Sequence, residues 1–168
     1  MLNIVLTLKI KAMKNTYKIS GLLSLFIVLS SISFAQNITN DGNFFVNENG
    51  EKQNGELISY YENGQKEVVY EVEEGKQNGK VEFFYPSGKL QEQGFYKEGE
   101  KDGTWIKWSE DGKKLAEANY RNGSKDGSWV IWDNNGVKRY EMEYTNGERS
   151  GTWISRDEQG NEISKKAY

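Results

Sequence analysis

The chain of 168 residues contains no cysteine and no histidine, and its only proline is Pro86. Without cysteine, the fold cannot be held together by disulfides. The same two absences remove thiol nucleophiles, histidine general bases and the imidazole and thiolate ligands of most zinc sites. Only carboxylate, hydroxyl, amine or tyrosine chemistry remains. We therefore expect no catalytic, cofactor-binding or metal-ligating set of residues.

Positive charge is also scarce over most of the chain. Four of the 22 basic residues lie before Ala35, whereas all 25 acidic residues lie after it. Residues 36–168 therefore carry 18 basic and 25 acidic side chains, which is a net charge of −7. A surface this acidic lacks the electrostatic footprint of a nucleic-acid-binding protein. Nucleic acid is not an expected partner.

The one long apolar run, GLLSLFIVLSSISFA at 21–35, follows four lysines. A basic region, an apolar region and a small-residue exit predict a secretory signal peptide over 1–35, with cleavage after Ala35 and Met13 as an alternative start. The run is short for a bilayer span, so a permanent anchor is the weaker alternative. We expect an exported protein of the periplasm, the cell envelope or the extracellular space.

Glycine, in contrast, is plentiful and recurs at fixed intervals. Of 18 glycines, 14 fall into three series with a period of 24 residues. Two series are predicted to be structural repeat glycines, and they are Gly55, Gly79, Gly103, Gly127 and Gly151, followed nine residues later by Gly64, Gly88, Gly112, Gly136 and Gly160. The third series is Gly75, Gly99, Gly123 and Gly147. Internal repetition at this length indicates stacked supersecondary units.

Each unit contains two short segments around its middle glycine. In the fourth unit the second segment, KRYEMEY at 138–144, alternates between polar and apolar residues, which predicts a half-buried β-strand. Asn-Gly and Asp-Gly pairs between the two segments are typical of tight hairpin turns with positive φ. Each unit is therefore expected to form one β-hairpin, and a pair such as Gly75 and Gly79 leads into the next.

The predicted fold is all-β: an elongated antiparallel meander sheet of about five hairpin repeats, after an N-terminal signal-peptide helix. The predicted repeats are 53–76, 77–100, 101–124, 125–148 and 149–168, and residues 36–52 are expected to form a leader and a degenerate N-terminal cap. Polar replacements in the last unit suit a terminal cap. Exposed end strands would permit a homodimer through edge or face pairing.

The stretch NGSKDGSWVIW at 122–132, continued to Gly136, resembles the MORN-repeat proteins, and more closely their bacterial variant with the pattern NG-x-x-x-G-x-W-x-x-W/Y-x-x-x-G. The resemblance extends over residues 53–168. It implies a hairpin-repeat sheet that serves as a scaffold for protein or lipid contact, without catalysis of its own. Bacterial members of this kind are often labelled YwqK-type antitoxins. For an exported chain, an exported or incoming toxin would be the consistent target.

A two-residue hairpin loop defines which residues face each other across the strands. The expected pairs are Trp129 with Met142, Ile131 with Tyr140, Trp105 with Ala118, and Leu57 with Tyr70. One continuous apolar face then results, and its predicted core column is Leu57, Val81, Trp105, Trp129 and Trp153. A four-residue loop would keep this arrangement, whereas a three-residue loop would exchange the two faces.

The opposite face carries the candidate binding residues Tyr60, Phe84, Trp108, Trp132 and Arg139. Aromatic rings framed by charge are typical of an interaction surface. The alternatives are that these rings cover a second thin core, or that a bulge turns them into the first one. Aspartates beside glycines, such as Asp102, Asp126 and Asp133, are interpreted as turn residues and not as calcium ligands.

The predicted function is that of an exported, non-enzymatic scaffold that binds a protein and needs no cofactor. One alternative is an antitoxin or immunity protein against an exported toxin. Another is a glycan- or lipid-binding envelope module, in which an aromatic ladder with a spacing of about 10 Å stacks on sugar rings.

Overall fold

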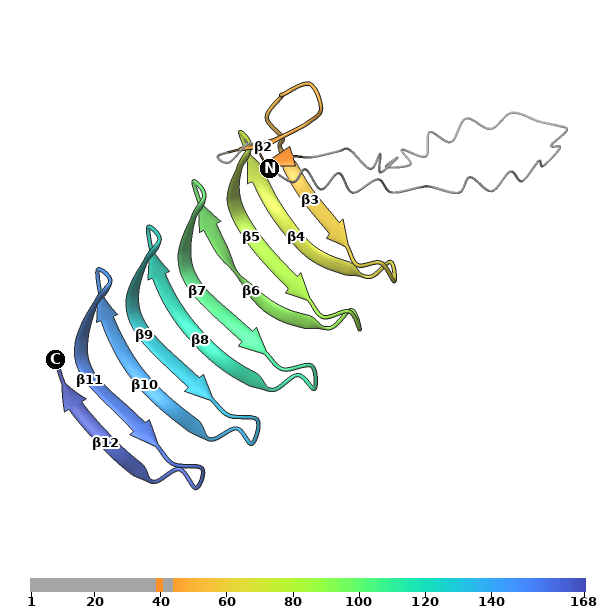
Figure 1. The fold of residues 1–168 in the computed structure, drawn as a ribbon. Helices are drawn as coiled ribbons and strands as arrows, with labels where there is room; N and C mark the ends of the chain where they lie inside the picture. The colour runs from red at the N-terminus through yellow and green to blue at the C-terminus, as the bar shows by residue number, and fades with distance from the viewer. Residues whose placement is uncertain (1–38, 41–43) are drawn as a thin grey trace, which may run out of the picture. The chain divides into compact units, whose positions relative to one another are not determined.

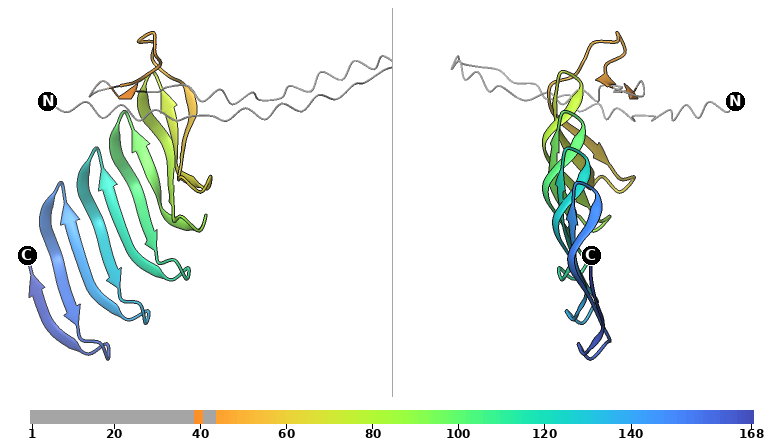
Figure 2. Two further views of the ribbon diagram at one scale, coloured as in Figure 1. Left: turned by 45° about the vertical axis from the view of Figure 1, so that its right-hand side comes forward. Right: turned by 90° about the vertical axis from the view of Figure 1, so that its left-hand side faces the viewer.

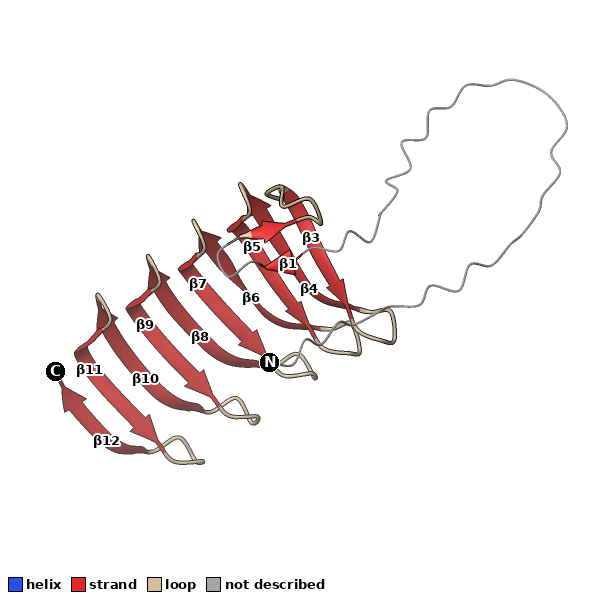
Figure 3. Ribbon diagram, turned by 45° about the horizontal axis from the view of Figure 1, so that its top comes forward, coloured by secondary structure: helices blue, strands red, loops and turns tan. Residues whose placement is uncertain are grey.

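The computed structural model describes residues 39–40 and 44–168, which belong to one compact unit, Ala35–Tyr168. Every regular element of this part is a β-strand, as Figure 3 shows. It contains no helix with the length and apolar character needed to cross a membrane. The predicted signal peptide, 1–35, lies outside the described residues.

Ten strands form one antiparallel sheet in which each strand pairs with its neighbours in sequence (Figure 1). They are β3 (Gly55–Tyr60), β4 (Lys66–Glu73), β5 (Lys76–Phe84), β6 (Leu90–Lys97), β7 (Glu100–Trp108), β8 (Lys114–Arg121), β9 (Ser124–Trp132), β10 (Lys138–Thr145), β11 (Glu148–Arg156) and β12 (Glu162–Ala167). Two short strands, β1 (Thr39–Asn40) and β2 (Phe45–Val46), pair separately. The predicted meander of five hairpins is confirmed.

The sheet is a single layer, as both views in Figure 2 show. We call the side that carries Trp105 and Trp129 face A, and the side that carries Trp108 and Trp132 face B. At the first hairpin β2 lies against face A, where the ring centroids of Phe45 and Tyr70 are 5.7 Å apart. Elsewhere in the described residues, no further layer of strands or helices packs on either face.

The connection inside each hairpin is a three-residue loop, not the predicted two-residue turn. In the fourth hairpin the backbone N–H of Asp133 donates to the carbonyl of Val137 (3.0 Å), and that of Gly136 donates to the carbonyl of Asp133 (3.0 Å), so residues 134–136 form the loop. Beyond this closing pair, Trp132 pairs with Lys138. Within this loop φ is positive only at Gly136, at 82°. Arg139 is then an extra residue in β10, a bulge that shifts the register by one.

The loop and the bulge cancel each other, because each shifts the pairing by one residue and exchanges the faces. The predicted strand register is therefore correct even though the predicted loop was wrong. All four expected pairs are present: Trp129 with Met142, Ile131 with Tyr140, Trp105 with Ala118, and Leu57 with Tyr70.

The tight two-residue turns occur between hairpins. At Asn122 and Gly123 φ is 47° and 76°, and the same pair of positive values recurs one repeat earlier and later. Two adjacent residues with positive φ define the type I′ turn, which suits the twist of antiparallel strands. A side-chain oxygen twenty residues upstream accepts a hydrogen bond from the first residue of each turn. The acceptor is Asp102 for Asn122 (3.3 Å) and Asp126 for Asn146 (3.1 Å), whereas the first two turns use Asn54 and Asn78. These two aspartates therefore have the predicted turn role.

A second bulge follows each tight turn and contains one glycine of the series, which is Gly79, Gly103, Gly127 or Gly151. In β5, residues 78–80 lie opposite Glu71, between the pairs Val72–Gln77 and Tyr70–Val81. The φ of Gly79 is 123°, and a Cβ at this position would overlap the side chain of Glu71. Only glycine meets both conditions without strain.

The core lies on face A near the middle of the sheet. Val81, Trp105 and Ala118 are 0%, 3% and 9% exposed and form one cluster. Of the predicted core column, Val81 and Trp105 are buried, whereas Leu57, Trp129 and Trp153 are only half-buried. Burial declines towards the C-terminal end, where a side chain of the single layer is covered only by its neighbours within the sheet. Towards the N-terminal end Val72 of β4 is still buried, at 4% exposed.

The tryptophans of face A also hydrogen-bond to the backbone. The indole N–H groups of Trp105, Trp129 and Trp153 donate to the carbonyl oxygens of Phe95 (3.2 Å), Asn119 (3.0 Å) and Glu143 (2.9 Å). These rings alternate with tyrosines in a continuous chain of ring contacts, which runs Tyr96, Trp105, Tyr120, Trp129, Tyr144, Trp153, Tyr168. Edge-to-face and tilted pairs of this kind stabilise beyond the area that they bury.

Candidate functional site

Face B carries a row of aromatic side chains at one position of four successive hairpins. Tyr60, Phe84, Trp108 and Trp132 are the last residues of β3, β5, β7 and β9. Each pairs with the first residue of the following strand, which is Lys66, Leu90, Lys114 or Lys138. The fifth hairpin has Arg156 at this position, paired with Glu162, so the aromatic row ends there.

Ion pairs lie beside this row. Lys114 Nζ is 2.8 Å from Glu117 Oε2 and 5.6 Å from the centroid of the Trp132 ring. One repeat later, Lys138 Nζ is 3.0 Å from Glu141, which also binds Arg156. The aromatic row is thus bordered by paired charges of both signs.

Exposure differs along face B. Tyr60 is 55% exposed, whereas Phe84, Trp108 and Trp132 are half-buried. Phe95, which the sequence analysis did not select, is 50% exposed on the same face. The alternation of β6 could have identified it, because Tyr96 lies on face A and its neighbour must point to face B.

Arg139, the fifth candidate residue, has partners within the sheet. It is the bulge residue of β10, and its Nε donates to the carbonyl of Arg156 (2.8 Å). Its Nη1 lies 3.5 Å from Asp133 Oδ2. This guanidinium therefore joins the fourth hairpin to the fifth, and the aromatic row is the part of the candidate site that remains open to a partner.

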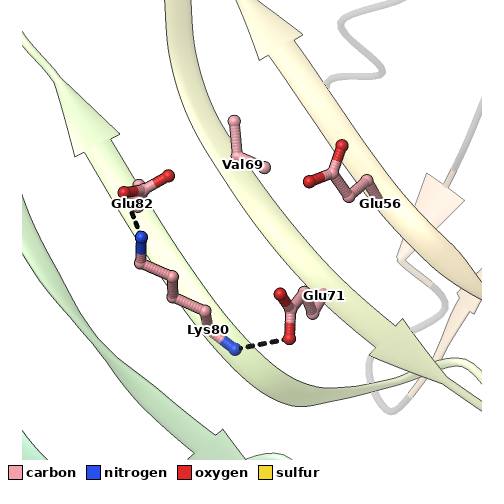
Figure 4. Close-up of a pocket in the computed structure, with 5 residues that line it drawn as sticks. All are labelled: Glu56, Val69, Glu71, Lys80 and Glu82. Atoms are coloured by element: carbon pink, nitrogen blue, oxygen red, sulfur yellow. Dashed lines mark hydrogen bonds and ion pairs between the residues drawn. The ribbon is translucent and has the colours of Figure 1, made fainter.

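A shallow polar pocket of about 190 Å³ lies on face B over β3–β5 (Figure 4). Three glutamates and Lys80 surround Val69. The carboxylate of Glu71 accepts from the backbone N–H of Lys80 (2.9 Å), and the ammonium of Lys80 pairs with Glu82. The described residues include no cluster of acidic side chains that could hold a metal ion.

In the last hairpin loop, several hydrogen bonds hold the side chain of Asp157 as a carboxylate. The carboxylate of Asp157 accepts from the backbone N–H groups of Gln159 (3.0 Å) and Asn161 (2.8 Å) and from the side chain of Asn161 (3.0 Å). The side-chain bond from Asn161 lowers the pKa of Asp157 most, and the backbone bonds add to this against the opposing effect of burial.

Because the pKa of Asp157 is lower in the folded state, this carboxylate stabilises the fold above the ordinary aspartate pKa of about 3.9. The contribution is lost as the pH falls through the folded value. We expect the urea midpoint to drop less between about pH 6 and about pH 3 in Asp157→Asn than in the wild type. Equal drops in both proteins would contradict this role.

The hairpin topology defines a tandem β-hairpin repeat protein. The pattern of the MORN repeat variant family matches residues 53–71, 77–98, 101–122 and 125–146, and the chain belongs to this family. Its members form repeat scaffolds and are generally not enzymes. The fifth hairpin, β11–β12, has the same fold but lies beyond the matched residues.

Other comparisons add little. A search of curated proteins finds no match to this chain. Fifteen chains of solved structures match. One of them, in the crystal structure of a GtfA/B complex bound to UDP and GlcNAc, is 14% identical with a TM-score of 0.27. The match covers 85% of this chain and 26% of that chain, and a likeness this low supports no argument about function.

Proposed function

We propose that this chain is an exported, non-enzymatic scaffold that binds a protein partner through the aromatic row of face B. The strongest support is that Tyr60, Phe84, Trp108 and Trp132 occupy one position of four successive hairpins. A partner that lies across the strands would meet a ring every two strands, about 10 Å apart. Aromatic side chains are enriched in the buried centres of interfaces and supply much of their binding free energy.

The ion pairs beside the row suit the rim of such an interface. The pairs Lys114–Glu117 and Lys138–Glu141 remain accessible to solvent, so they contribute little to the stability of the free sheet. In a complex, charges at the rim orient a partner and raise the association rate. An aromatic centre and a charged rim together favour a protein as the partner of face B over an uncharged ligand.

Export is proposed from residues 1–35 alone. Cleavage after Ala35 predicts that protein recovered from the periplasm or the medium begins at Gln36, which N-terminal sequencing would detect.

The resemblance to YwqK-type antitoxins names one narrower class of partner, an exported toxin. Co-expression with a toxin-like reading frame adjacent to the gene would test this, and growth that the chain does not restore would argue against it.

The binding face is tested with two matched double variants. W108A/W132A shortens the row on face B, whereas I131A/Y140A removes an exposed pair on face A, where Ile131 is 37% and Tyr140 is 48% exposed. Proteins captured from envelope and medium fractions by the wild type would be purified and titrated by calorimetry. We expect W108A/W132A to weaken binding at least tenfold, about 1.4 kcal/mol, and I131A/Y140A to have little effect.

Two results would contradict this proposal. Equal weakening by both double variants would remove face B as the specific surface. A neutral polysaccharide that shifts the tryptophan fluorescence in a saturable way, with the shift lost in W108A/W132A, would replace the protein partner by a glycan.

A further inference from the structure

Face A carries a row of cations that the sequence analysis did not identify. Lys101, Lys125 and Arg149 are spaced by 24 residues and are the second residues of β7, β9 and β11. Neighbouring cations are therefore two strands apart, about 10 Å. The regular spacing and the shared parity with the tryptophans were visible in the sequence, but not the contacts of these side chains.

Each cation lies over the tryptophan of its own strand. Lys101 Nζ is 3.6 Å from the centroid of the nearest Trp105 ring, Lys125 Nζ is 4.3 Å from that of Trp129, and Arg149 Cζ is 4.6 Å from that of Trp153. A tyrosine from the following strand or just beyond it is also near each cation. The distances from cation to ring centroid are 5.1 Å for Tyr120, 4.7 Å for Tyr144 and 5.4 Å for Tyr168. Attraction between cation and ring holds the three charges in a defined line before any ligand arrives.

Among the described residues, one carboxylate faces this row of three cations, that of Glu92 near Lys101. Within residues 44–168 neither Lys125 nor Arg149 forms an ion pair, and Lys101 is 4.0 Å from the single carboxylate of Glu92. Burial lowers the pKa of Lys101, an effect that Glu92 opposes. On face B, in contrast, Lys80, Lys114 and Lys138 each pair with a glutamate at 3.0 Å or less. Two of the three cations thus have no carboxylate partner among the described residues, and in an acidic protein such cations are suited to an external anion.

The rings beside the cations are partly accessible. Trp129, Tyr144 and Trp153 are half-buried, and Tyr168 is 44% exposed. Sugar rings stack their apolar C–H faces on aromatic rings, and their carboxylates pair with cations. An acidic peptide would use the cations alone, and a neutral polysaccharide would leave them unpaired.

We infer that face A over β7–β12 binds an acidic polysaccharide, with carboxylates on Lys101, Lys125 and Arg149 and sugar rings against the neighbouring aromatic residues. A spacing of about 10 Å between cations suits a polymer with one carboxylate per disaccharide. The site does not depend on the proposed function, because it uses the other face of the sheet.

The test uses hyaluronate, which has one carboxylate per disaccharide, with dextran as the neutral probe and poly-glutamate as the peptide probe. Binding to the purified protein is measured by calorimetry at low ionic strength. We expect saturable binding of hyaluronate only, weakened at least tenfold in K125Q/R149Q because two charge-assisted contacts are lost. The matched control K97Q/K165Q removes the same charge from exposed lysines of face B and is expected to change the affinity less than about twofold.

Three outcomes would overturn the inference. They are no saturable binding of hyaluronate, equal weakening by both double variants, and binding of poly-glutamate or dextran as tight as that of hyaluronate. A second measurement needs no variant and so is independent of folding defects. Bound hyaluronate is expected to protect Lys101 and Lys125 from acetylation, relative to Lys97 and Lys165, and unchanged acetylation would equally reject the site.

Discussion

Replacement of Trp105 by alanine is expected to lower the free energy of unfolding by about 3–5 kcal/mol. The side chain is 3% exposed and belongs to the central cluster with Val81 and Ala118. The substitution removes ring contacts with Tyr96 (5.1 Å) and Tyr120 (6.2 Å), together with the indole hydrogen bond to the backbone. Urea unfolding followed by circular dichroism measures the change without relying on tryptophan fluorescence.

Trp153→Ala is the matched control, because Trp153 has the same position in the last hairpin and the same type of hydrogen bond. The side chain of Trp153 is only half-buried, so its removal is expected to lower the free energy of unfolding by about 1–2 kcal/mol. Equal destabilisation by the two substitutions would show that stability is not concentrated at the centre of the sheet.

Gly94→Ala is expected to lower the free energy of unfolding by about 1–3 kcal/mol, although the substitution adds only one methyl group. Gly94 lies outside the three glycine series and its φ is not positive. A Cβ at this position would overlap the indole of Trp105, which lies directly on β6. The ring would have to leave its place in the core.

A double-mutant cycle tests this cause directly. In the Trp105→Ala background the cost of Gly94→Ala should disappear, which would give a coupling energy of about 0.5–3 kcal/mol. Gly112→Ala is the control: nothing lies near its Cβ, but its φ is 84°, so its strain is local. Its cost should be the same in both backgrounds. A Gly94 penalty that persists without the Trp105 ring would contradict the steric explanation.

The strand register was predictable because two independent signals agree. The glycine period sets the length of each hairpin, and the alternation in segments such as 138–144 assigns side chains to faces. Trp129 opposite Met142 follows from these signals alone. The loop type was not predictable, because a two-residue turn and a three-residue loop with a bulge at Arg139 give the same pairing further along the strands.

The candidate site was predictable only in part. Periodicity places Trp108 and Trp132 on face B, but it does not show that Arg139 is held by Asp133 and the carbonyl of Arg156. The cations of face A were missed for a related reason. The second bulge adds two residues, so parity from Trp105 still puts Lys101 on face A, but the sequence does not show that Lys101 folds back over the ring.

Strands of this sheet pair only with their neighbours in sequence. Hairpins that touch only adjacent hairpins have nearly additive energetics. The gain or loss of 24 residues by duplication or deletion would then lengthen or shorten both faces by about 10 Å while every other contact stays as it is. The reach of this protein across a partner is a quantity that evolution can adjust in whole repeats.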